Sequence, residues 1–183
     1  MRMAVIALLA LLLFFGCIGP EAAFRYSDVS SPCSVVASGE VRAIYGFRAI
    51  SETPVEKENE YSFCLYSGQT TGNESTRGTR NYIMMMYVPY ANSNDTIREN
   101  FLFENSTTQA YITDENLGLG NESFIAISRD KETGRINYIS LAVLEGPSMI
   151  LVTDAGYPMS GVDISNKGKL KELAEIALKR LAK

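Results

Sequence analysis

Two tight turns in the second half of the chain constrain its fold more than any other feature. Residues 131–134 read Lys-Glu-Thr-Gly and residues 145–147 read Glu-Gly-Pro, and they separate apolar stretches at 124–128, 136–144 and 149–153. Turns this short connect antiparallel strands, because a parallel pair needs a crossover of about a dozen residues. The sequence therefore predicts three consecutive antiparallel strands in this region.

Four further stretches have the character of strands. They lie at 47–50, 61–66, 81–90 and 109–113. Residues 61–66 alternate, so Tyr61, Phe63 and Leu65 should point to one face and Ser62, Cys64 and Tyr66 to the other. Residues 81–90 are apolar on both faces, which is typical of a central strand covered on both sides. The three methionines 84–86 should alternate between faces there, and so they cannot converge on one copper ion.

Three helices complete the expected fold. Residues 38–45 form a short helix that Ser38 caps and Gly46 ends, and residues 94–103 form an inserted helix with an Ile97–Phe101 pair. From Lys167 onward helical spacing relates Leu170, Leu173, Ala174, Ala177 and Leu181. A basic amphipathic helix can lie on a membrane, but we expect this one to pack on the sheet. The predicted fold class is α+β, a mostly antiparallel sheet with a short N-terminal helix, one inserted helix and a packed C-terminal amphipathic helix.

The N-terminus has the character of an export signal. Arg2 precedes an apolar run from Ala4 to Phe15, which is shorter than the roughly twenty residues of a membrane-spanning helix. Gly16-Cys17 follows, and the stretch resembles a lipobox, in which the cysteine becomes lipid-modified; Cys17-Ile18-Gly19 resembles the opening of many archaeal surface lipoproteins. We expect a signal peptide at 1–16, a tether at 17–31 and a single globular domain at 32–183. An uncleaved signal anchor and a soluble secreted protein are the alternatives.

The two remaining cysteines suggest a disulfide. With Cys17 modified, Cys33 and Cys64 form an even pair in an oxidising compartment. A loop of about thirty residues closed in this way stabilises the fold by roughly 3.5 kcal/mol. The alternative, a redox-active pair, is usually spaced as Cys-x-x-Cys, and this pair is not. Candidate N-glycosylation sites at surface loops or element ends are Asn73, Asn94, Asn105 and Asn121, each in an Asn-x-Ser/Thr sequence.

Several of these residues also carry a family resemblance. Pro32-Cys33-Ser34-Val35-Val36, the segment Ser38 to Val41, Gly46, and the stretch from Tyr61 through Cys64 to Tyr66 form the set. Together they resemble actinobacterial surface lipoproteins of unknown function, which have a Pro-Cys-Ser start, a short helix ending in Gly and a second Cys in a strand. Such domains are similar in outline to the PsbP-like α/β/α sandwich, which implies a binding or assembly module without catalytic residues.

Composition excludes several classes of function. The chain has no histidine, so Ser-His-Asp triads and His-ligated zinc are excluded. The formal net charge is −4, and removing Arg2 makes it more negative, which argues against nucleic acid as a partner. Oxygen ligands from Asp114 to Glu122 surround a Gly-rich turn, as calcium sites do, but their spacing is not that of an EF-hand and turn chemistry explains them. We expect no metal and no cofactor.

The resulting functional expectation is a membrane-anchored extracellular lipoprotein. It would act as a non-catalytic binding or assembly module of the cell envelope. Its partners would be the membrane, through the lipid on Cys17, and an envelope protein, glycan or lipid ligand. The alternatives are a purely structural surface protein and a histidine-free hydrolase of glycosidase type, which requires two carboxylates about 5–10 Å apart in a cleft.

Overall fold

The structure is a computed structural model of the whole chain, and it describes residues 31–57, 61–70, 80–88, 98, 102, 107–145, 148–156 and 161–181. The signal peptide and nearly all of the tether expected from the sequence lie outside these ranges. Within them, none of the helices combines the length and the apolar character needed to cross a membrane.

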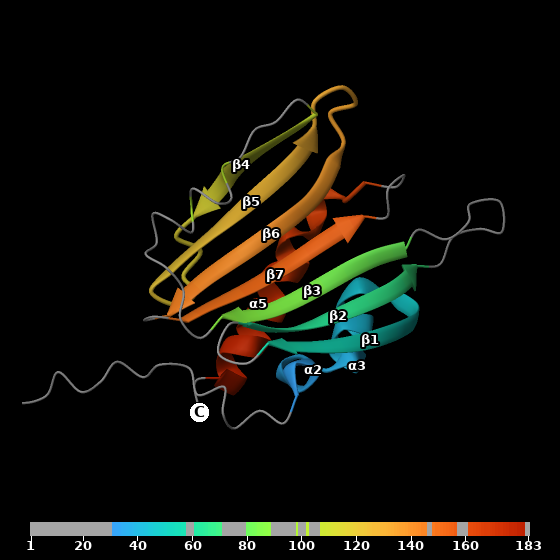
Figure 1. Cartoon of the computed structure of the whole chain (residues 1–183), viewed down its shortest axis with the longest axis vertical. Coiled ribbons are helices and arrows are strands. Elements are labelled where there is room, and N and C mark those ends of the chain that lie inside the picture. The colour runs from blue at the N-terminus through green and yellow to red at the C-terminus, as the bar shows by residue number, and fades with distance from the viewer. Residues whose placement is uncertain are drawn as a thin grey trace, which may run out of the picture.

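A seven-stranded antiparallel sheet makes up most of the molecule (Figure 1). Its strands in chain order are β1 (Phe47–Lys57), β2 (Tyr61–Thr70), β3 (Arg80–Val88), β4 (Thr108–Glu115), β5 (Glu122–Asp130), β6 (Ile136–Glu145) and β7 (Ser148–Gly156). Their spatial order is β1-β2-β3-β7-β6-β5-β4. The chain therefore forms hairpins at both ends of the sheet and joins the two halves through the β3–β7 pair. The predicted turns at 131–134 and 145–147 connect β5 to β6 and β6 to β7.

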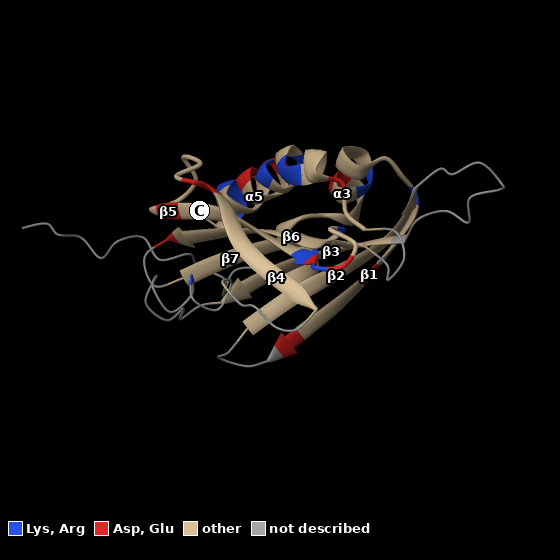
Figure 2. Ribbon diagram, turned by 90° about the horizontal axis from the view of Figure 1, so that it is seen from above, with Lys and Arg blue, Asp and Glu red and all other residues tan. Residues whose placement is uncertain are grey.

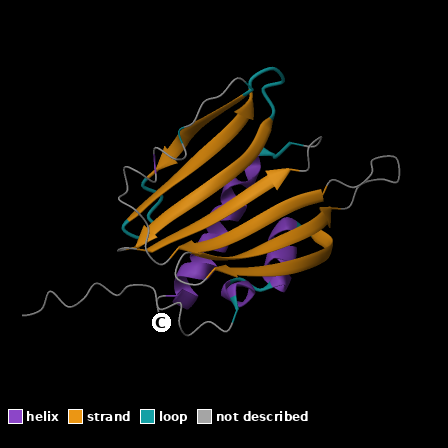
Figure 3. Cartoon of the chain, in the orientation of Figure 1, coloured by secondary structure: helices purple, strands orange, loops and turns teal. Residues whose placement is uncertain are grey.

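The described helices are few beside seven strands, so α+β describes this sheet-dominated fold only roughly. They are α2 (Pro32–Val35), α3 (Ser38–Tyr45), the 3-10 turn η2 (Ile164–Asn166) and α5 (Lys167–Leu181). α2, α3 and α5 lie on one face of the sheet, as Figures 2 and 3 show from two directions. We call this face the inner face and the opposite one the outer face.

The C-terminal helix packs on the sheet as its spacing predicts. Its buried residues are Leu170, Leu173, Ala174, Ala177 and Leu181. They contact β6 and β7, while Lys179 and Arg180 near its end are exposed. The inserted helix expected at 94–103 lies mostly outside the described residues. Within it, Arg98 is helical, and the amide of Leu102 donates to the carbonyl of Arg98 at 3.1 Å, the i to i+4 bond of a helical turn.

The α3 helix has the predicted bounds but not the predicted cap. Its N-cap residue is Ala37, whose amide donates to the Glu40 carboxylate at 2.8 Å, and Ser38 is already inside the helix. Glu40 takes the capping role because its carboxylate reaches back to the backbone amide of Ala37, which has no acceptor within the helix. Gly46 ends the helix with a φ of 69°, which favours glycine.

The core lies mainly between the inner face and the helices. Side chains that alternate along each strand supply it, including Tyr66, Ile83, Ile139, Leu141 and Val152. The predicted alternation of β2 is confirmed, since Ser62, Cys64 and Tyr66 are buried and their neighbours Phe63 and Leu65 are only partly so. β3 lies centrally, as expected, but its outer side chains Met84 and Met86 are half-buried rather than covered.

Candidate binding surface

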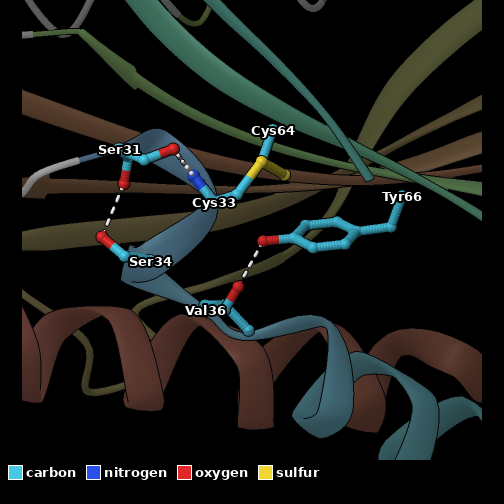
Figure 4. Close-up of a disulfide and its surroundings, with 6 residues drawn as sticks. All are labelled: Ser31, Cys33, Ser34, Val36, Cys64 and Tyr66. Atoms are coloured by element: carbon cyan, nitrogen blue, oxygen red, sulfur yellow. Dashed lines mark hydrogen bonds between the residues drawn. A yellow bond between two sulfur atoms is a disulfide. The ribbon is translucent and has the colours of Figure 1, made fainter. Parts of the chain in front are cut away.

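A disulfide and a hydrogen bond attach the N-terminal segment to the inner face (Figure 4). Cys33 in α2 is bonded to Cys64 in β2, with their Cα atoms 4.9 Å apart, so the pairing expected from the sequence is the one in the structure. Two residues further along β2, the buried Tyr66 hydroxyl donates to the carbonyl of Val36. Ser31 caps α2 by accepting from the amide of Cys33 at 3.3 Å. This region is structural, because its polar groups are used within the chain.

The outer face carries a group of partly exposed apolar side chains on β2 and β3. Phe63 and Leu65 of β2 lie opposite Met86 and Met84 of β3, respectively, and all four side chains are half-buried. We call these four residues the β2–β3 patch. Their neighbours in the register are uncharged: Val55 and Thr53 on β1, and Leu151 and Thr153 on β7. The patch is thus a continuous apolar strip on β2 and β3, in the half of the sheet that ends at β1.

The other half of the outer face is more deeply covered. Phe124, Ala126, Ala142, Leu144 and Leu151 form a buried cluster on β5, β6 and β7. The guanidinium of Arg98 lies 5.4 Å from the centre of the Phe124 ring. The outer face therefore passes from a buried half, towards β5, to a partly open half at the β2–β3 patch.

Acidic side chains near the β4–β5 turn are neutralised by basic residues of the chain itself. Arg98 pairs with both Glu115 and Glu122. Its hydrogen bond to Glu115 is the main cause that raises the pKa of Arg98. Lys167 donates to Asp114 at 2.5 Å and holds the pKa of that carboxyl below its usual range. In the described part of the chain, no three acidic or cysteine side chains are grouped to hold a metal ion.

The same pairing bears on the hydrolase alternative. Glu115 and Glu122 converge, but they do so on one guanidinium that binds both carboxylates. A glycosidase pair instead holds one acid protonated and leaves space for sugar and water between the two. The two ion pairs anchor Arg98 to the β4–β5 hairpin. They give no support to catalysis by Glu115 and Glu122.

The remaining residues singled out in the sequence have mixed outcomes. Asn121 is exposed in the turn before β5, and its backbone amide donates to the carbonyl of Leu144 at 2.8 Å. Cys17, Asn73, Asn94 and Asn105 lie outside the described residues. The β2–β3 patch was not predicted as a site, although the alternation of 61–66 and the two apolar faces of 81–90 contained its signal.

Comparisons with known proteins give little further guidance. No family model matches the chain, and no curated protein matches it. Among solved structures it is similar to the extracellular domain of PknH from Mycobacterium tuberculosis, with a TM-score of 0.47 and 11% sequence identity, over 81% of this chain and 93% of that one.

Proposed function

We propose that this chain is an exported lipoprotein whose domain binds an apolar surface of another envelope component through the β2–β3 patch. The observation that carries the binding role is the patch itself. Half-buried Phe63, Leu65, Met84 and Met86 form one strip on a sheet face without described charges among its register neighbours. None of the four is fully exposed, but each keeps part of its surface open to solvent, and contiguous accessible apolar surface is a mark of interaction sites. Methionine suits such a role because its unbranched side chain adapts to the shape of a partner.

The tether supports a position close to a membrane. Cys17 precedes the first described residue, Ser31, by fourteen positions, and fourteen residues can span at most about 50 Å. The domain begins beside the end of α5, because Arg180 donates to the carbonyl of Val35 at 2.9 Å. A lipid on Cys17 would therefore keep this end of the domain nearest the membrane and would leave the outer face accessible from the side.

The chemistry of the patch favours a protein or lipid partner over a glycan. Glycan recognition relies on polar groups that bind hydroxyls, whereas the patch presents thioether, aliphatic and aromatic surface. Burial of such surface contributes roughly 25 cal/mol per Å² removed from water, and this term is non-directional. A partner with a complementary apolar surface is the expected ligand.

Affinity capture from detergent-solubilised membranes tests the proposal. The wild-type protein should retain a defined protein or lipid, identified by mass spectrometry, and the Leu65→Lys variant should lose it because a charge would enter the patch. Glu172→Lys places the same side chain on the exposed side of α5 and should retain the partner. Equal capture by wild type and Leu65→Lys, or no specific capture at all, would count against the proposed function.

A further inference from the structure

A buried carboxyl group lies where the helices meet the sheet. Asp154 occupies β7, its side chain is 0% exposed, and it is directed at the inner face. Its neighbours on β3 and β6 are Ile83 and Ile139, which are equally buried and apolar. An acid in such surroundings requires explanation, because an ionised carboxylate is strongly disfavoured without water or a paired cation.

Polar groups from the helical layer approach this carboxyl. The Asn166 amide in η2 donates to Asp154 Oδ2 at 2.7 Å, and Asn166 is itself 5% exposed. Tyr45, at the end of α3, has a buried hydroxyl that interacts with the same carboxyl and, like Asn166, favours its ionised form. However, neither Tyr45 Oη nor Asp154 Oδ1 makes a hydrogen bond of normal geometry.

Among the described residues, one cation, Lys169, acts on the Asp154 carboxyl, and it acts without a direct hydrogen bond. Lys169 of α5 lies with its Nζ 5.0 Å from the centre of the Tyr45 ring, and its charge favours the ionised form of Asp154. The charged and titratable groups facing Asp154 are thus Tyr45 from α3 and Lys169 from α5, while η2 supplies a neutral amide and the neighbouring strands supply isoleucine. Burial outweighs these contributions and raises the pKa of Asp154 to about 6.

We propose that Asp154 forms a proton-dependent joint, at which α3 and the η2–α5 segment are held more tightly to the sheet when the carboxyl is protonated. A neutral carboxyl can donate from Oδ1 towards Tyr45 while Oδ2 still accepts from Asn166. Ionisation introduces a charge into this apolar layer and favours loosening of the helices so that water can reach it. The domain would then be more stable in mildly acid surroundings than at neutral pH.

The direction of the pH dependence follows from the two pKa values. An unfolded aspartate titrates near pH 4, whereas the folded group titrates near 6. Between these values the unfolded chain releases its proton while the folded chain keeps it, so stability falls as the pH rises through this window. The loss is complete above the folded pKa. Asp114 contributes a pH dependence of the opposite sign: Lys167 lowers its pKa, so its contribution to stability is lost as the pH falls.

Thermal unfolding of the full-length protein between pH 4 and pH 8 tests the joint. Asp154→Asn keeps the shape of the side chain and an oxygen that can accept from Asn166, but it cannot ionise. The difference in Tm, variant minus wild type, should increase by roughly 5 °C from pH 4 to pH 8, and about half of the increase should be complete near pH 5, between the unfolded and folded pKa values. Glu172→Gln, at an exposed position of α5, should follow the wild type. A difference that does not change with pH would overturn the proposal.

A second measurement does not depend on the variant folding. Carbon-13 NMR of the wild-type protein can follow the Asp154 carboxyl directly during a pH titration. A midpoint well above 4.5, accompanied by lower amide protection factors in α3 and α5 on the alkaline side after correction for base-catalysed exchange, supports the joint. A carboxyl that titrates at its ordinary value, or helix amides whose protection ignores the transition, would overturn it.

Discussion

At the scale of single residues, two side chains of β2 hold the N-terminal segment by different chemistry. Cys64 does so through a covalent bond to Cys33, and Tyr66 through a hydrogen bond to the carbonyl of Val36. The first contact could be predicted, because three cysteines with one assigned to the anchor leave a single pairing. The second could not, because its acceptor is a backbone carbonyl, which every residue carries.

Removing the disulfide should lower stability without removing the fold. The bond closes a loop between residues 31 positions apart, so the double variant Cys33→Ser, Cys64→Ser should lose about 3.5 kcal/mol, or roughly 7–14 °C in Tm. Thermal denaturation of the oxidised wild type and the double variant measures this. Binding through the β2–β3 patch should persist, because the patch lies on the opposite face. A double variant with unchanged Tm, or one that keeps its fold but loses binding, would contradict this account.

At the scale of elements, the local sequence pattern predicted the C-terminal helix but not the full length of β1. The spacing of Leu170, Leu173 and Ala177 placed α5 correctly, because burial on one face imposes the helical period. β1 continues to Lys57, beyond the predicted 47–50, although residues 51–57 read Ser-Glu-Thr-Pro-Val-Glu-Lys and have the composition of a loop. β1 is an edge strand, and Pro54 with exposed charges is a common feature of edges that avoid pairing with other chains.

Two adjacent positions in α5 test the packing of that helix. Leu173 is 1% exposed, so Leu173→Ala should cost about 2–5 kcal/mol through lost burial and the cavity that remains. Glu172 is exposed, and Glu172→Ala should change stability by less than about 0.5 kcal/mol. Chemical denaturation of both variants measures the difference. Similar losses at the two positions would mean that α5 does not pack on the sheet as described.

At the scale of the whole molecule, the order of the strands in the sheet could not be predicted from the sequence. The hairpins between neighbouring strands were predictable, but the β3–β7 pair joins strands more than sixty residues apart and has no local signature. That pair decides which side chains meet on the outer face. The β2–β3 patch and the environment of Asp154 both depend on it, so neither could be placed before the strand order was known.

The proposed lipid anchor also belongs to this scale, because it determines where the domain works. The expected oxidising surroundings of the disulfide and the access of the β2–β3 patch to envelope partners both follow from it. The Cys17→Ser variant should be released from the membrane or keep its signal sequence uncut, whereas Cys33→Ser should remain attached, because Cys33 belongs to the disulfide. Fractionation of cells that express each variant distinguishes these outcomes.

The most direct test is the intact mass of the wild-type protein extracted from membranes. The account predicts a chain that begins at Cys17, lacks residues 1–16 and carries the additional mass of lipid on that cysteine. Fragmentation of the N-terminal peptide should locate the added mass at Cys17. A chain that retains Met1, or one that begins at Cys17 without lipid, would contradict the proposal that this domain is a membrane-anchored lipoprotein.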